Sequence, residues 1–308
     1  MTGRRGHWAG STGAVLALSI SAAMLLAGCL TDAGSASLAP TGSAAPDATP
    51  TVTSFHLDTT VWYAGIAIEF GTAIASLDAK GGPVTVTLAL QNLGAEDASI
   101  EGPIRLAAGD QSVEPARETV IPTVPAGTRI ATKIAFEVGP GFDFAAAAIR
   151  VGRSSEHQAV VPLLKAGSPI VPQTLEPITA SLAAKVVAGA LSVVIHRAEL
   201  RADLPDWHQE MPREVLALTL TYDATFTGSF SGGLPFTSDS VSLRLPDGRT
   251  VQPRRDGHSQ SLIVIGPGVK APALQSRFEV GPPGGGTYTL FVSDGATKKS
   301  VAFELTIP

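Results

Sequence analysis

Cysteine is nearly absent from this 308-residue sequence, which contains only Cys29. A single thiol excludes an intramolecular disulfide and a zinc site built from several thiolates. Only 16% of the residues are charged, which argues against a coiled coil, and 44% are hydrophobic, which argues against a disordered chain. The net charge is −5 and no long basic run occurs, so nucleic acid is not expected as a partner.

Aromatic residues are also scarce, at 6%, whereas glycine and proline are frequent, at 32 and 23 residues. Glycine and proline interrupt helices and favour turns, so the composition predicts a turn-rich, all-β protein. The length exceeds that of a typical domain of ~100 to 200 residues, which predicts two domains in addition to any targeting segment.

The N-terminal segment has the pattern of an export signal. Arg4 and Arg5 precede a small and apolar stretch at positions 14–27, which ends in Leu-Ala-Gly before Cys29. This stretch is too short to span ~30 Å of hydrocarbon comfortably and is typical of a signal-peptide core. Its end resembles the bacterial lipobox, the motif in which the cysteine receives diacylglycerol and the peptide is cut before it. The alternative is an ordinary secreted protein with a cysteine there by chance.

The lipobox resemblance implies residues 1–28 as signal peptide and Cys29 as the lipidation site. Covalent diacylglycerol would be the only added group, with no other cofactor. Two acyl chains hold a protein on a bilayer far better than one, so we expect a lipid anchor on the outer face of the cytoplasmic membrane. Residues 29–53 are rich in serine, threonine and proline and bury little apolar surface, which predicts a flexible tether.

Beyond the tether, the sequence repeats itself. The Ala-Gly pair at 64–65 recurs at 188–189, and Phe-Glu-Val-Gly-Pro at 136–140 recurs letter for letter at 278–282. Short segments with alternating apolar residues lie between these landmarks in the same order in both copies, as in two copies of one β-sandwich. A proline-rich stretch separates the copies, which predicts domains at 54–166 and 178–308. The alanine-rich run at 179–191 suits a helix, but the repeat makes its second half a strand.

The segment 284–292 is similar to the entry of the sixth strand in immunoglobulin-like domains. Tyr288 would close the preceding corner by hydrogen bonding to upstream backbone, and Leu290 would stand where antibody domains have a cysteine. The first copy departs from this pattern, with Ala147 at the matching position. Residues 55–308 therefore resemble tandem immunoglobulin-like domains of actinobacterial lipoproteins, in the loose superfamily of mycobacterial secreted immunoprotective antigens. The expected fold is all-β, with two tandem immunoglobulin-like β-sandwiches, and the resemblance implies no activity.

Catalytic and metal-binding motifs are missing from the sequence. Gly257-His258-Ser259 and the two residues after it lack the second glycine of a nucleophile elbow, and no His-Glu-x-x-His occurs. We therefore expect no catalytic residues, no metal site and no enzymatic activity, although histidines distant in sequence could still meet at a metal.

The repeat separations identify insertions in the second copy, of eight residues within Arg201–Glu214 and seven within Asp223–Ser240. Long loops on a rigid sandwich often carry recognition, so Trp207, His208 and Phe230 are candidate binding residues. In the alternative interpretation, Trp207 folds back and fills the end of its own core.

These features favour a non-enzymatic, lipid-anchored binding or scaffolding protein of the cell envelope. Its expected partners are the membrane, through the lipid, and an envelope protein or glycan. The alternative is an extracytoplasmic carrier of a small ligand or a metal, which would require a buried apolar pocket with converging polar groups.

Overall fold

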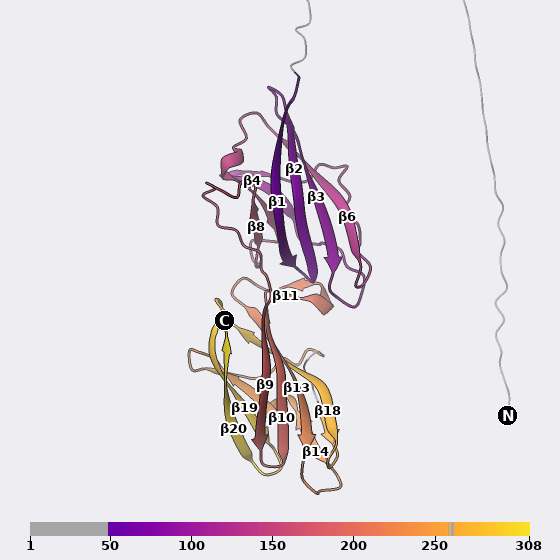
Figure 1. Ribbon diagram of the computed structural model, residues 1–308, viewed down its shortest axis with the longest axis vertical. Coiled ribbons are helices and arrows are strands. Elements are labelled where there is room, and N and C mark those ends of the chain that lie inside the picture. The colour runs from indigo at the N-terminus through magenta and orange to yellow at the C-terminus, as the bar shows by residue number, and fades with distance from the viewer. Residues whose placement is uncertain (1–48, 258, 260–261) are drawn as a thin grey trace, which may run out of the picture. The chain divides into compact units, whose positions relative to one another are not determined.

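The computed structural model describes residues 49–257, 259 and 262–308, and the regular secondary structure of these residues is almost entirely β (Figure 1). This confirms the expected all-β fold class. The helical content of the described residues is three short 3₁₀ turns, and none of their helices is long and apolar enough to cross a bilayer. The predicted signal peptide, Cys29 and most of the predicted tether lie outside the described residues. The turns are η1 (Phe144–Ala146), η2 (Pro205–Trp207) and η3 (Ser238–Ser240).

The first half of the described chain contains eight strands. They are β1 (Thr51–Tyr63), β2 (Ile66–Leu77), β3 (Gly82–Asn92), β4 (Ile104–Ala108), β5 (Gln111–Val113), β6 (Arg129–Val138), β7 (Ala147–Val151) and β8 (Ala159–Pro162). One antiparallel sheet has the order β1-β2-β3-β6 and the other the order β5-β4-β7-β8. The buried residues of both sheets form one apolar core, which includes Phe70, Phe136, Leu106 and Ile149.

The second half contains twelve strands. They are β9 (Ile178–Ala188), β10 (Leu191–Arg201), β11 (Asp203–Leu204), β12 (Gln209–Glu210), β13 (Leu216–Phe226), β14 (Leu234–Thr237), β15 (Val241–Arg244), β16 (Thr250–Val251), β17 (Leu262–Ile265), β18 (Lys270–Val280), β19 (Gly286–Asp294) and β20 (Lys299–Ile307). The two larger sheets have the orders β9-β10-β13-β18 and β16-β15-β19-β20, and they enclose a second apolar core.

The strand order of the two larger sheets is the same in both halves. The repeated segments 136–140 and 278–282 begin within β6 and β18, which take equivalent edge positions and bury Phe136 and Phe278. Two further two-stranded sheets, β11–β12 and β14–β17, occur in the second half, and each begins within one of its two insertions. The domain limits 54–166 and 178–308 and the immunoglobulin-like assignment stay predictions.

Two expected boundaries differ in the structure. The run at 179–191 is strand from its beginning to Ala188, where the turn to β10 follows. Strand β9 pairs with β10 from Ile178 to Ala188 with one register shift, and this pairing overrides the helix preference of alanine. Strand β1 begins at Thr51, inside the range expected for the tether, because its first residues pair with the end of β2.

The segment between the halves is held by the first half. Gln173 and Val160 exchange two backbone hydrogen bonds of 2.9 Å, and the N–H of Trp62 donates to the carbonyl of Thr174 at 2.9 Å. The first half therefore forms backbone hydrogen bonds with the chain beyond position 166, as far as Thr174, which lies shortly before the start of β9.

The predicted tyrosine corner is present at the start of β19. The buried hydroxyl of Tyr288 donates a hydrogen bond to the backbone carbonyl of Gly284. This contact fixes the bend before the strand, and Leu290 then points into the second core.

Candidate functional site

A groove of about 360 Å³ lies on the outward face of the β10-β13-β18 sheet. Its floor is the outward row of the middle strand, Ala217, Thr219 and Thr221, all of which have short side chains. The alternation of β13 explains this row, since Leu218 and Leu220 between them point into the core. We call this cavity the Trp207 groove.

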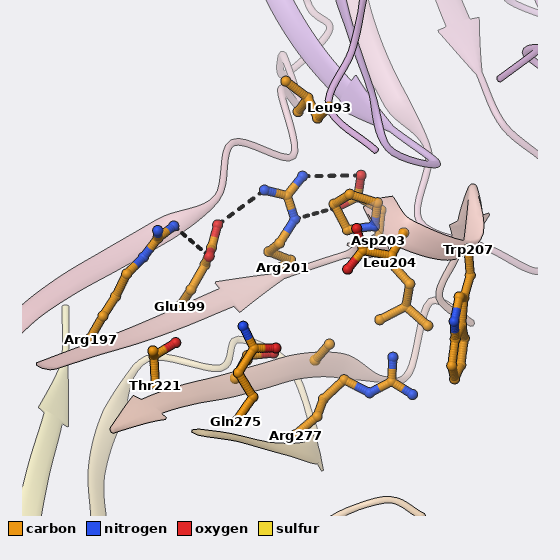
Figure 2. Close-up of a pocket in the computed structure, with 14 residues that line it drawn as sticks. Leu93, Arg197, Glu199, Arg201, Asp203, Leu204, Trp207, Thr221, Gln275 and Arg277 are labelled. Carbon is orange, nitrogen blue, oxygen red and sulfur yellow. Dashed lines mark hydrogen bonds and ion pairs between the residues drawn. The ribbon is translucent and has the colours of Figure 1, made fainter. Parts of the chain in front are cut away.

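Register places longer polar side chains on both sides of the floor. Each floor residue is paired with β10 on one side and with β18 on the other. The cross-strand rows are Arg201–Ala217–Glu279, Glu199–Thr219–Arg277 and Arg197–Thr221–Gln275. A strand with short side chains between two strands with long ones produces a trough, and Figure 2 shows the two flanking strands with Trp207 at one end.

The β10 wall is a chain of ion pairs. Arg201 contacts Asp203 through Nε at 2.7 Å and Glu199 through a terminal nitrogen at 3.1 Å, and Glu199 also pairs with Arg197. Burial alone would lower the pKa of Arg201, but the two carboxylates hold it above its ordinary value. The guanidinium groups of this wall are thus compensated by carboxylates, while their remaining N–H groups can still donate hydrogen bonds.

The other wall ends at Arg277, which is only 6% exposed although it lies on the outward face of the sheet. Its guanidinium pairs with Asp256, and its central carbon lies 4.5 Å from the ring centroid of Trp207. Burial, followed by repulsion from Arg254, lowers the pKa of Arg277. Its Nε has no hydrogen-bond partner among the described residues. Trp207 itself remains 38% exposed at the end of the groove.

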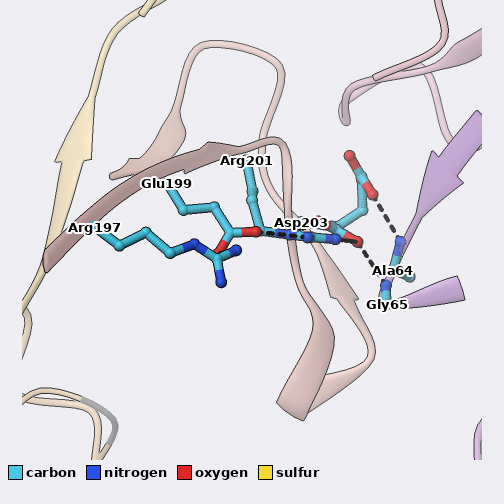
Figure 3. Close-up of polar contacts among 7 residues, drawn as sticks. Ala64, Gly65, Arg197, Glu199, Arg201 and Asp203 are labelled. Carbon is cyan, nitrogen blue, oxygen red and sulfur yellow. Dashed lines mark hydrogen bonds and ion pairs between the residues drawn. The ribbon is translucent and has the colours of Figure 1, made fainter. Parts of the chain in front are cut away.

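The end of the groove is the β11–β12 hairpin, and this hairpin is fixed against the first half. The N–H groups of Ala64 and Gly65 donate to Glu210 at 2.9 Å and to Asp203 at 2.7 Å, respectively (Figure 3). The N–H of His157 donates to the carbonyl of Met211 at 3.2 Å. The first insertion therefore contacts another part of its own chain as well as lining the groove.

Glu210 is 5% exposed, and its second carboxyl oxygen has no hydrogen-bond partner among the described residues. Burial, followed by the nearby charge of Asp203, raises the pKa of Glu210 to about 10. Glu210 is consequently protonated at neutral pH and accepts the hydrogen bond from Ala64 as an uncharged acid.

A second pocket of about 290 Å³ lies beside Glu210 and between the halves. The hydroxyl of Tyr63 donates to Glu156 there at 2.8 Å, and Arg153 contacts the same carboxylate at 2.9 Å. Burial alone would raise the pKa of Glu156, but these two hydrogen bonds hold it below its ordinary value. Burial, followed by the hydrogen bond to Glu156, raises the pKa of Tyr63.

The predicted binding residues lie in three different environments. Trp207 lines both pockets, whereas His208 lines only the second one and has its ring close to Gly94 of the first half. Neither ring nitrogen of His208 has a hydrogen-bond partner among the described residues. Phe230 is 69% exposed in the loop after β13 and does not line the Trp207 groove. Cys29, the predicted lipidation site, lies outside the described residues.

The floor and walls of the groove were not identified from the sequence. Two signals were present: the alternation of small outward residues at 217, 219 and 221, and the charged residues Arg197, Glu199 and Arg201 at every second position. These patterns place residues on one face of a strand, but they do not show which strands are neighbours.

Metal ligands are not clustered in the described part of the chain. No group of three or more His, Cys, Asp or Glu side chains within residues 49–257, 259 and 262–308 is placed to hold a metal ion.

Comparison with known proteins gives no family for this chain: no protein-family model and no curated protein matches it. The resemblance to tandem immunoglobulin-like lipoproteins therefore stays a prediction, and function has to be inferred from the groove and from the chemistry of its residues.

Proposed function

We propose that this chain is a non-enzymatic binding protein of the cell envelope, anchored by lipid at Cys29, whose contact site is the Trp207 groove. The observation that carries this proposal is the composition of the groove. An exposed tryptophan packs on a buried arginine beside a hydroxyl-bearing floor, between walls that offer both donors and acceptors. Exposed aromatic rings next to oriented polar groups are characteristic of recognition surfaces.

The groove favours a binding role over a carrier role. A carrier of a small apolar ligand requires an enclosed apolar pocket, whereas this groove lies on the outward face of a sheet. Its lining is mainly polar, and its arginines are already paired with carboxylates. A partner that spreads along the surface suits this geometry better than a ligand that must be enclosed.

The lipid anchor would place the groove at the outer face of the cytoplasmic membrane. The serine-, threonine- and proline-rich segment that begins at Cys29 would allow the folded part to reach up to ~80 Å from its lipid. This reach would allow contact with envelope material that is not embedded in the bilayer.

Filling the groove tests the proposal. In Thr219→Tyr a large ring would occupy the floor, whereas Thr225→Tyr places the same ring on the same face of β13 outside the groove. Full-length protein is cross-linked in intact cells, and the envelope material attached to it is quantified. We expect Thr219→Tyr to reduce this material about tenfold, equivalent to ~1.4 kcal/mol of binding, and Thr225→Tyr to retain it. Equal capture by both variants, with unchanged melting temperatures, would refute the groove as the contact site.

A further inference from the structure

We infer that the Trp207 groove binds an uncharged oligosaccharide, most simply a segment of a neutral envelope glycan. This inference rests on the proposed function and adds to it the chemical class of the occupant.

The position of β13 in its sheet excludes one common mode of binding. Strand β13 is hydrogen-bonded to β10 on one side and to β18 on the other, so the floor has no free backbone edge. An extended peptide that adds a strand to a sheet needs such an edge. The floor also lacks the apolar pockets that would hold alternate side chains of a peptide, since it presents two threonines and an alanine.

The charges in the groove argue against an anionic occupant. Arg197 and Arg201 are paired with carboxylates of the same wall, and Arg277 is paired with Asp256. A polyanion would have to compete with each of these carboxylates. An uncharged ligand leaves the ion pairs intact and can use the N–H groups and oxygens that they do not occupy.

Vicinal hydroxyl groups match this arrangement. Each sugar hydroxyl can donate to a carboxylate such as Glu199 and accept from a guanidinium such as Arg201, and these two groups lie next to each other on the wall. Gln275 supplies both a donor and an acceptor on the opposite wall, and the hydroxyls of the floor do the same. All sides of the groove are therefore suited to an occupant rich in hydroxyl groups.

Trp207 and Arg277 form the end of the site. The guanidinium of Arg277 lies over one face of the indole and fixes its orientation. The part of Trp207 that remains exposed offers a flat apolar surface of the kind that packs on the C–H face of a pyranose ring. Successive floor residues lie ~7 Å apart, so the three together accommodate a short stretch of linked sugars.

Tryptophan fluorescence of the full chain in detergent tests this inference. A Trp62→Phe background leaves Trp207 as the only tryptophan after Cys29. The probes are saccharides released from the envelope of the source cells and separated by anion exchange into a neutral and an anionic fraction. We expect the neutral fraction to shift the emission of Trp207, and Thr219→Tyr to raise the required concentration about tenfold, equivalent to ~1.4 kcal/mol. Thr225→Tyr should leave the response unchanged.

The salt dependence of binding distinguishes an uncharged saccharide from an anionic one. Binding of an uncharged saccharide should change less than about twofold between ~0.05 and ~0.5 M NaCl, because no new ion pair forms. A response to the anionic fraction alone, with a steep salt dependence, would overturn the inference. The inference would also be overturned if neither fraction shifted the emission of Trp207 while envelope proteins still cross-linked at the groove. That result would leave the proposed function intact. If Thr219→Tyr changes neither the binding of saccharides nor the capture of envelope material, both proposals fail.

Discussion

The backbone N–H of Gly65 donates a 2.7 Å hydrogen bond to the carboxylate of Asp203, joining residues 138 positions apart. Ala64, the preceding residue, makes the equivalent bond to Glu210. Both turn residues have positive φ, 48° for Ala64 and 80° for Gly65, as a tight turn between β1 and β2 requires. The turn thereby presents two consecutive donors to the β11–β12 hairpin, and the end of the groove is fixed by the first half of the chain.

The first prediction concerns Gly65, where an added Cβ would lie 2.7 Å from the backbone of Pro205. Gly65→Ala should destabilise the protein by about 2 kcal/mol or more, because it combines an unfavourable φ with a backbone clash. Gly127→Ala is the matched control, since Gly127 also has positive φ but its Cβ would meet nothing within 4 Å. Urea denaturation measures both variants. Equal losses of unfolding free energy in the two variants would show that the close approach to Pro205 adds nothing to the cost of Gly65→Ala.

The second prediction is a pH dependence that originates at Glu210. Its folded pKa of about 10 lies above its ordinary value of 4.5, so the folded state binds more protons than the unfolded state between these values. The contribution of Glu210 to the free energy of unfolding should therefore be greatest below pH 4.5. It should fall as the pH rises toward 10, by at most about 1.4 kcal/mol per pH unit.

Glu210→Gln should remove this contribution, since the amide is uncharged and its oxygen can still accept from Ala64. Melting temperatures at pH 5, 7 and 9 should converge in the variant, which should exceed the wild type at pH 9. Glu214→Gln serves as the control, because the side chain of Glu214 is 76% exposed. Parallel melting curves for the wild type and Glu210→Gln would contradict the assignment of the pH dependence to Glu210.

The third prediction separates the two interpretations of Trp207. A residue that fills a core costs ~3 kcal/mol or more when it is truncated to alanine. Trp207 is 38% exposed, and Arg277 lies over its ring. We therefore expect Trp207→Ala to cost about 1 kcal/mol of stability, a size typical of a cation–π contact, and to reduce envelope capture by a larger factor. A melting temperature many degrees lower would identify Trp207 as a structural residue.

The fourth prediction concerns the lipid anchor. Cys29→Ala removes the thiol that would receive diacylglycerol, so the protein should remain uncleaved or be released into the medium. Membrane fractionation with mass spectrometry of the N-terminus detects either outcome. Recovery of cleaved, membrane-bound Cys29→Ala protein at the wild-type yield would refute the lipobox.

Much of the β-structure could be predicted because strand formation depends on local alternation. The apolar residues of β13 alternate with Thr219 and Thr221 along the sequence, and the structure has the same alternation between core and surface. Strand β9 was only partly predicted, since its alanines favour a helix and its pairing partner, β10, determines the outcome.

Only one end of the candidate site, the insertion that contains Trp207, could be predicted from the sequence. The repeat separations located the insertion that contains Trp207, because a length difference between two copies can be read directly from the sequence. They did not show that His208 would face the first half, close to Gly94, whereas Trp207 packs on Arg277. The two neighbouring side chains point to different surroundings because the backbone at His208 is left-handed, with φ of 49°.

The sequence alone therefore determined the all-β class, the repeated pattern and the insertions, because each depends on composition or on residues close in sequence. It also predicts the lipid anchor, which stays a prediction. Tertiary structure decided the groove, since Thr219 and Arg277 are neighbours only through the register between β13 and β18. It also decided the protonation of Glu210, because burial of a carboxyl group depends on which surfaces pack together. Contacts between distant segments carry no local signal in a single sequence.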